Sequence, residues 1–177
     1  PAAFLKARAD AANWAGLRVG DYTDITVGSQ TFRYRIAGFD QYYNCSDTAR
    51  KHHIVMVPDD GWSTNVQWNT TATNNGTAAQ EHPYLASNAY DYLINTLLPQ
   101  YPSAWQAVMQ THRVLLEKRY SSAGALSAST GWAWQDIGKL WLPSETEVYG
   151  QCVWGTPGYS VGIDHKFPLF DSRYAAL

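Results

Sequence analysis

Two adjacent histidines, His52 and His53, are the residues of this 177-residue chain best suited to metal chemistry. Neighbouring residues of a strand point to opposite faces, so their two rings do not easily share one ion. We therefore expect one packed and one exposed histidine. The acidic pair Asp59 and Asp60 stands in a Pro-Asp-Asp-Gly sequence, which is typical of a turn and not of a cation site.

Two carboxylates, Glu145 and Glu147, have the spacing of an acid–base pair, but capping explains both more simply. The Ser144 hydroxyl can accept from the backbone N–H of Glu147, whose carboxylate can reach back to the N–H of Ser144. Glu145 places a negative charge in the first helical turn, where the helix dipole favours it. Gly150 supplies the left-handed residue that often ends a helix. We expect a very short helix here and no catalysis.

The two cysteines, Cys45 and Cys152, are far apart in the chain and lack metal-ligand spacing. The sequence is compatible with a disulfide between them and with two buried free thiols. Free thiols are favoured because nothing else in the sequence indicates an oxidising compartment. Nucleophile-elbow, phosphate-loop and His-Glu-x-x-His motifs are missing from the sequence. We predict a non-enzymatic protein with no catalytic residue, no metal and no cofactor.

Composition narrows the classes of partner. Charged residues make up 16% of the chain, below the usual quarter or so, and the net charge of −2 disfavours broad contact with nucleic acid. The chain has no apolar run near 18 residues, so we expect no membrane insertion. Its size fits one domain, which we place at residues 17–177 as an excerpt of a longer protein, with 1–16 as a linker or N-terminal helix.

Aromatic residues are the main sign of a binding role, since the chain has 12 tyrosines and eight tryptophans. Tyrosine and tryptophan bury much area at low entropic cost, so they suit recognition surfaces as well as cores. The binding candidates lie in two polar segments and are Tyr42, Tyr43, Trp62, Trp68, Asn69 and Asn74. The predicted core around the short helix consists of Trp141, Leu142, Ser144, Glu147 and Trp154.

The periodicity of the sequence indicates an α+β fold of short antiparallel strands, two or three helices and long irregular loops. Arg33 and Arg35 alternate with apolar residues and mark the wet face of a hairpin. The long segment 61–80 is rich in Asn, Thr and Gly and has little periodicity, so we expect an ordered functional loop or, alternatively, disorder. The expected elements are a helix over 1–16, strands over 22–27, 31–37, 53–57, 114–120 and 166–170, and helices over 83–97 and 102–109.

Seven motifs follow one another along residues 17–170: GDYTDITV, FRYRIAGFDQYYN, HHIVMV, VQWNTTATNNGT, LEKRYSS, KLWLPSETEVYG and VWGTPGYSVG. In this order they resemble an uncharacterised C-type-lectin-like family of phage and prophage structural and tail proteins and of bacterial surface proteins. The segment over 140–150 is also distantly similar to the signature of the formylglycine-generating-enzyme superfamily.

The resemblance implies a C-type-lectin-like fold and a virion module, on a tail, fibre or capsid, that binds a host surface or neighbouring virion proteins. The alternative is a bacterial surface or extracellular domain that binds glycan or protein. A formylglycine-generating enzyme is disfavoured because the paired cysteines of that family have no counterpart in this chain. Calcium-dependent sugar binding is disfavoured because the sugar-binding motifs of calcium lectins are absent from the sequence. Family members continue with further C-terminal strands, which we expect this chain to lack.

Loss of those strands leads to an expectation about the hairpin. Its strands, 22–27 and 31–37, should show an unpaired edge that a neighbouring chain or further sequence covers. We accordingly expect a homo-oligomer or an assembly with other virion proteins.

Overall fold

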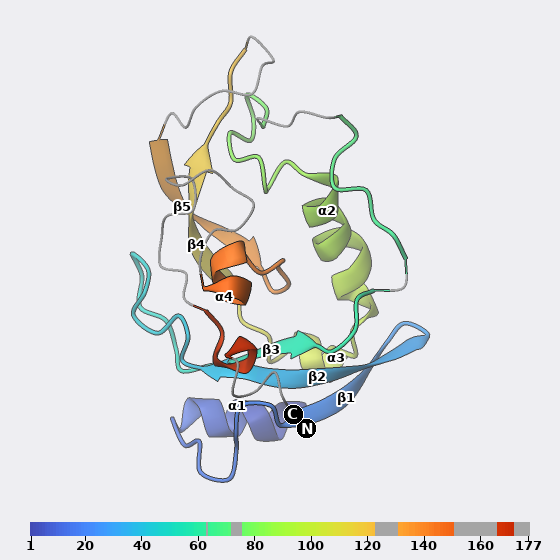
Figure 1. Cartoon of the computed structure of the whole chain (residues 1–177), viewed down its shortest axis with the longest axis vertical. Helices are drawn as coiled ribbons and strands as arrows, with labels where there is room; N and C mark the ends of the chain where they lie inside the picture. Colours follow the sequence, from blue (N-terminus) through green and yellow to red (C-terminus); the bar gives the residue numbers. More distant parts are fainter. Residues whose placement is uncertain (63, 72–75, 123–130, 151–165, 172–177) are drawn as a thin grey trace. The chain divides into compact units, whose positions relative to one another are not determined.

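The computed structural model describes residues 1–62, 64–71, 76–122, 131–150 and 166–171 of the chain. These residues form an α+β fold with antiparallel sheets, as expected from the sequence (Figure 1). They divide into two compact units, which are described here one at a time. The first comprises Pro1–Gly61, Pro102–Val108 and Leu142–Leu177, and the second comprises Trp62–Tyr101 and Met109–Trp141. The prediction of a single domain over 17–177 stays a prediction.

The first unit is built on an antiparallel sheet of β1 (Tyr22–Val27), β2 (Gln30–Phe39) and β3 (Ile54–Pro58), in the order β1-β2-β3. Gly28 adopts a left-handed φ of 59° in the two-residue turn between β1 and β2, which glycine adopts without steric cost. The predicted hairpin is therefore confirmed. The apolar face is buried at Ile25, Val27, Phe32 and Ile36.

The opposite face of this sheet is polar, as the two arginines predicted. The Arg33 Nε atom donates to Asp24 over 3.0 Å, and the Arg35 Nε atom donates to Asp59 over 2.6 Å. The Arg33 guanidinium also lies 3.8 Å from the ring centroid of Tyr22. Surface ion pairs of this kind add little stability. They nevertheless form a row of alternating charges from Asp59, directly after β3, through β2 to Asp24 on β1.

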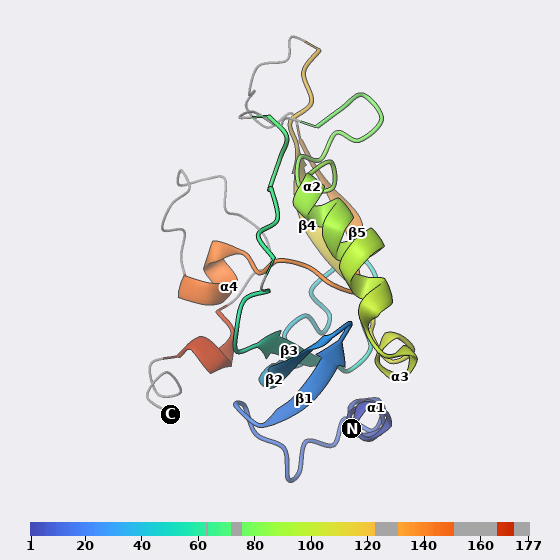
Figure 2. The same ribbon diagram turned by 90° about the vertical axis from the view of Figure 1, so that its right-hand side faces the viewer.

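The N-terminal helix α1 (Ala2–Asp10) is shorter than the predicted helix over 1–16. It ends before Ala12, whose φ of 48° is left-handed and incompatible with a continuing helix. Phe4 of this helix is 57% exposed, whereas Ala2 and Ala9 are buried. Helix α1 lies beside the hairpin (Figure 2).

The short helix α4 (Glu145–Tyr149) forms as predicted. Both hydrogen bonds of the capping box between Ser144 and Glu147 are present, and Gly150 follows with a φ of 81°. The predicted strand over 166–170 is wrong, because Pro168 begins a 3-10 turn over Pro168–Phe170 and has no N–H to give to a strand partner. A second short helix of this unit, α3 (Ser103–Gln106), lies within the predicted 102–109.

The second unit contains one longer helical segment. Helix α2 (Asn88–Asp91) continues into a π-helical stretch (Tyr92–Leu97) and a 3-10 turn (Leu98–Gln100). The predicted start near Pro83 is wrong, because the Ser87 hydroxyl accepts from the backbone N–H of Tyr90 over 3.1 Å and so caps the helix.

A two-stranded sheet completes the second unit. Strand β4 (His112–Lys118) overlaps the predicted 114–120 and pairs antiparallel with β5 (Gly131–Gly138). Strand β5 is not among the strands predicted from the sequence. Its end is buried at Ile137, which is 3% exposed.

Of the two hairpin strands, only β1 has an edge without a partner strand among the described residues. Strand β2 is paired on both sides, by β1 and β3, so the expectation is wrong there. Strand β1 pairs only with β2 among the residues that the structure describes.

The glycine that ends β5 provides a stability test. Gly138 has a φ of 85°, and a Cβ there would lie 2.6 Å from the Ile94 Cδ1 atom. Gly138→Ala should therefore lower the free energy of unfolding by about 1–3 kcal/mol, measured by urea denaturation. Gly61→Ala, with no atom within 4 Å of the new Cβ, should change it by less than about 0.5 kcal/mol. Equal effects of the two substitutions would contradict this account of Gly138.

Candidate functional site

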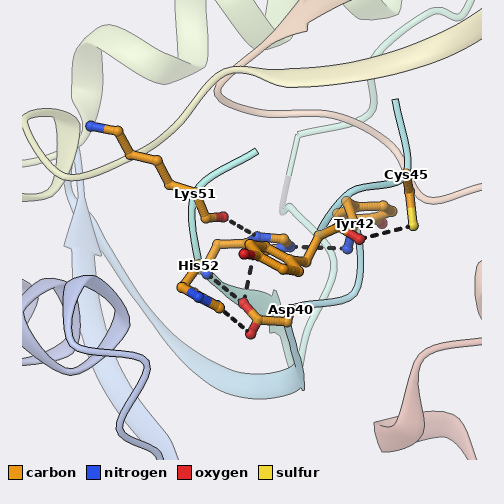
Figure 3. A network of polar contacts seen from close by, with 7 residues as sticks. Asp40, Tyr42, Cys45, Lys51 and His52 are labelled. Carbon is orange, nitrogen blue, oxygen red and sulfur yellow. Dashed lines mark hydrogen bonds and ion pairs between the residues drawn. The ribbon is translucent and has the colours of Figure 1, made fainter. Parts of the chain in front are cut away.

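The candidate site lies in the loop between β2 and β3, where the Asp40 carboxylate organises two histidines (Figure 3). One oxygen accepts from the Nδ1 atom of His52 over 2.7 Å, and the other accepts from the backbone N–H of His53 over 2.9 Å. Asp40 adopts a left-handed φ of 52°, a conformation in which aspartate is enriched among non-glycine residues. The carboxylate thereby fixes the two ends of the loop to one another.

His53 is held as a neutral ring with one defined tautomer. Its Nδ1 atom lies 2.9 Å from the Lys51 carbonyl oxygen, which can only accept, so Nδ1 carries the proton. Its Nε2 atom accepts from the backbone N–H of Tyr42 over 3.1 Å, so Nε2 has none. Burial lowers the pKa of His53, and the bond to Lys51 and the charge of Asp40 oppose that effect only in part. A proton on Nε2 would break the bond to Tyr42.

The two tyrosines of this loop have opposite environments. Tyr43 is 38% exposed and stacks on His52 with ring centroids 4.2 Å apart. Tyr42 is 4% exposed and stacks on His53 at 5.7 Å. Both tyrosines were predicted to bind a ligand. Tyr43 is partly exposed and can be reached by one, whereas Tyr42 is a core residue.

Tyr42 connects the loop to the buried carboxylate of Glu147. The Tyr42 hydroxyl donates to Oε1 of Glu147, which is 2% exposed, and the Ser144 N–H donates to Oε2 over 2.7 Å. Phe167, with 1% exposure, donates its N–H to the Glu147 carbonyl oxygen over 2.8 Å and meets the Tyr42 ring edge-on at 6.4 Å. Glu147 is thus both a cap and the polar centre of the first unit.

The second unit presents a different candidate at Trp68. This indole is 54% exposed, while the backbone around it is fixed to the start of α2. The Trp68 carbonyl accepts from the N–H of Ala89 over 3.2 Å, and the Thr70 N–H donates to the side chain of Asn88 over 3.0 Å. The ring is therefore exposed on an anchored segment, which favours the ordered loop over disorder for this part of 61–80.

The remaining predicted residues are spread over the chain. Trp62 and Asn69 are half-buried, as are Trp141, Leu142 and Ser144. Trp141 packs against the ring of His112 in the second unit, with centroids 4.5 Å apart. Asn74, Cys152 and Trp154 lie outside the described residues.

Sequence reasoning missed Asp40, the residue on which the loop depends. Its signal was weak, because a single aspartate before two tyrosines has no distinctive pattern. Cys45 carries a free thiol that contacts the Tyr43 carbonyl oxygen at 3.4 Å. The described residues contain no group of three or more His, Cys, Asp or Glu side chains placed to hold a metal ion.

Comparison of the chain with protein-family models, with curated proteins and with solved structures found no match. None of the helices in the described ranges is both long enough and apolar enough to cross a membrane.

Removal of the Tyr42 hydroxyl should destabilise the fold. Tyr42→Phe leaves the buried Glu147 carboxylate with one donor fewer, and we expect the free energy of unfolding to fall by about 1–3 kcal/mol in urea denaturation. The matched control is Tyr149→Phe, because Tyr149 is 52% exposed and should change stability by less than about 0.5 kcal/mol. A Tyr42→Phe protein as stable as the control would show that the hydroxyl contributes nothing.

The neutral His53 ring should make stability depend on pH. Its pKa is lowered in the folded state, so its contribution is complete above the unfolded pKa of about 6.5 and is lost as the pH falls from there through the folded pKa. Between pH 7.5 and 5.5, His53→Gln should reduce the loss of unfolding free energy, by up to about 1.4 kcal/mol per unit by which the pKa is lowered. Identical pH dependence of both proteins in urea denaturation would assign the effect to other groups.

Proposed function

We propose that this chain is a non-enzymatic binding module of C-type-lectin-like fold, carried on the tail, fibre or capsid of a phage virion. There it binds a host surface or a neighbouring virion protein. The ordered motifs over residues 17–170 support the fold and the virion setting by resemblance. The α+β architecture with long irregular segments is compatible with that resemblance.

The exposed indole of Trp68 is the observation that carries the binding role. Trp68 is 54% exposed, so about half of this large apolar residue is left without packing partners. Two hydrogen bonds, from Ala89 to the Trp68 carbonyl and from Thr70 to the Asn88 side chain, hold the backbone at Trp68 and just after it. A side chain on a backbone that is already held loses less entropy when a ligand covers it, which favours binding.

The polar loop of the first unit supports a structural interpretation over a catalytic one. Both ring nitrogens of His53 are engaged by backbone groups, and the Glu147 carboxylate caps α4. A general base must be free to take a proton from a substrate, and these two groups are occupied in holding the loop and helix in place.

The test uses particles of the phage or prophage that encodes the chain. Gradient-purified virions should contain peptides of this chain at a fixed ratio to the major capsid protein, measured by quantitative mass spectrometry. Trp68→Ala should slow adsorption to host cells, or lower the copies per particle, by about 30-fold, as for a residue at the centre of an interface. Tyr149→Ala removes another exposed ring and should leave both values within about twofold.

Two results would contradict the proposal in different ways. A chain recovered only as free or wall-bound protein would remove the virion role. Virions that incorporate Trp68→Ala normally and adsorb like the wild type would remove the binding role of Trp68 and leave the virion role standing.

A further inference from the structure

The outer edge of β1 presents a row of backbone hydrogen-bonding groups. Hydrogen-bonded pairs alternate along an antiparallel ladder, and Ile36 donates its N–H to the Asp21 carbonyl over 2.8 Å. It follows that Thr23, Ile25 and Val27 face β2. The N–H and C=O groups of Tyr22, Asp24 and Thr26 therefore point away from β2. No described strand lies beyond β1 on that side (Figure 2).

A cleft of about 660 Å³ is continuous with the first half of this edge. It is lined by residues of α1, of the segment between α1 and β1, and of all three strands. Phe4, one of the lining residues, is 57% exposed, so the cleft leaves a large ring accessible. The lining includes the apolar residues Phe4, Leu5, Leu17, Ile36 and Met56, the hydroxyl-bearing residues Tyr22 and Thr23, and the charged residues Asp21 and Arg35.

The polar face of the sheet, which carries Asp24, Arg33 and Arg35, indicates which charge a neighbouring strand should have. From the end of β3 to β1 the side chains run acidic, basic, acidic: Asp59, which directly follows β3, then Arg33 and Arg35 of β2, then Asp24 of β1. The hydrogen bond from Arg33 lowers the pKa of Asp24, which keeps that carboxylate ionised. Oppositely charged side chains stabilise adjacent strands, so the complement of Asp24 on the next strand is a basic residue.

We propose that this edge binds an extended peptide segment of a partner protein as a fourth strand. Lysine or arginine side chains of the segment lie beside Asp24, and alternate apolar side chains face the cleft next to Thr23. Backbone hydrogen bonds supply affinity and the alternating side chains supply specificity, as in other strand additions. This site is separate from Trp68 and does not rest on the proposed function.

The charge of β1 argues against a second copy of the chain as the occupant. A second β1 strand would bring its own Asp24 to the polar face, in place of the basic residue that this face complements. Like charges directly opposite one another destabilise a strand pair. The partner is therefore a basic, alternating segment of a different protein.

The test uses the full chain and the heptapeptide acetyl-Thr-Lys-Leu-Lys-Val-Arg-Thr-amide. By NMR hydrogen exchange, saturating peptide should slow exchange of the amides of Tyr22, Asp24 and Thr26 by about tenfold or more, while those of Thr23 and Ile25, already bonded to β2, change little. A peptide with glutamate at the three basic positions should bind about fivefold more weakly or worse.

Charge reversal on the protein provides a matched pair of variants. Asp24→Lys should weaken binding of the basic peptide by about fivefold or more, whereas Asp60→Lys, the same charge change at an exposed turn residue, should change it by less than about twofold. Should Asp24→Lys fail to fold, the comparison of the two peptides on the unchanged chain decides.

Three outcomes would overturn the proposal. The first is absence of binding at about 1 mM peptide, a concentration at which even weak complexes form. The second is binding without protection of the three outward amides. The third is protection of those amides without peptide together with a dimer mass, which would make a second copy the occupant.

Discussion

A buried carboxylate must be given donors when the chain folds, and the first unit is arranged around that requirement at Glu147. An ionised side chain removed from water is costly unless hydrogen bonds replace its hydration. Tyr42 and Ser144 supply two of these bonds from segments about a hundred residues apart in the chain. Helix α4 has five residues and would be marginal alone, so its position depends on these contacts as much as on its own backbone bonds.

The same requirement explains the conformation of the loop after β2. The Tyr42 ring must point inward to reach Glu147, and its N–H must meet a neutral His53. Asp40 allows the chain to leave β2 in this direction because it adopts a left-handed conformation. Its carboxylate also holds the other end of the loop, through hydrogen bonds to the His52 ring and the His53 N–H. The cost of the left-handed residue is offset by two hydrogen bonds to a carboxylate, which are stronger than neutral ones.

Local patterns predicted those parts of the fold that local interactions form. The hairpin follows from alternation and a Gly-Ser turn, and the capping box follows from Ser144 and Glu147 alone. Strand β5 was missed because a strand needs a distant partner, which the pattern of side chains does not identify. The strand predicted over 166–170 was wrong for a local reason, because Pro168 has no N–H to give to a strand partner. The end of α1 was misplaced because nothing in the sequence marks Ala12 for a left-handed conformation.

The candidate site was predictable only in part for the same reason. Tyr42 and Tyr43 are chemically identical neighbours, and the direction of each ring is decided by the turn at Asp40 and by Glu147 far along the chain. The sequence could show that Glu147 caps a helix, but its hydrogen bond to Tyr42 is a tertiary contact. Trp68 was proposed from the sequence as a binding residue, and with an exposure of 54% that role stays a prediction.

The single charge of strand β1, on Asp24, influences which strands can pair with its open edge. Edge strands in natural proteins are usually protected by lysine, proline, a bulge or a covering element, since an open edge invites pairing with identical edges. Asp24 is the only charged residue of β1, and its ion pair with Arg33 is too exposed to contribute much stability. Its stronger effect is on selection, because a carboxylate at the middle of the edge opposes a second β1 and favours a basic strand. A neutral residue at position 24 would neither oppose a second β1 strand nor favour a basic one. The charge of Asp24 is therefore better explained by the partner strand that it selects than by the stability of the sheet.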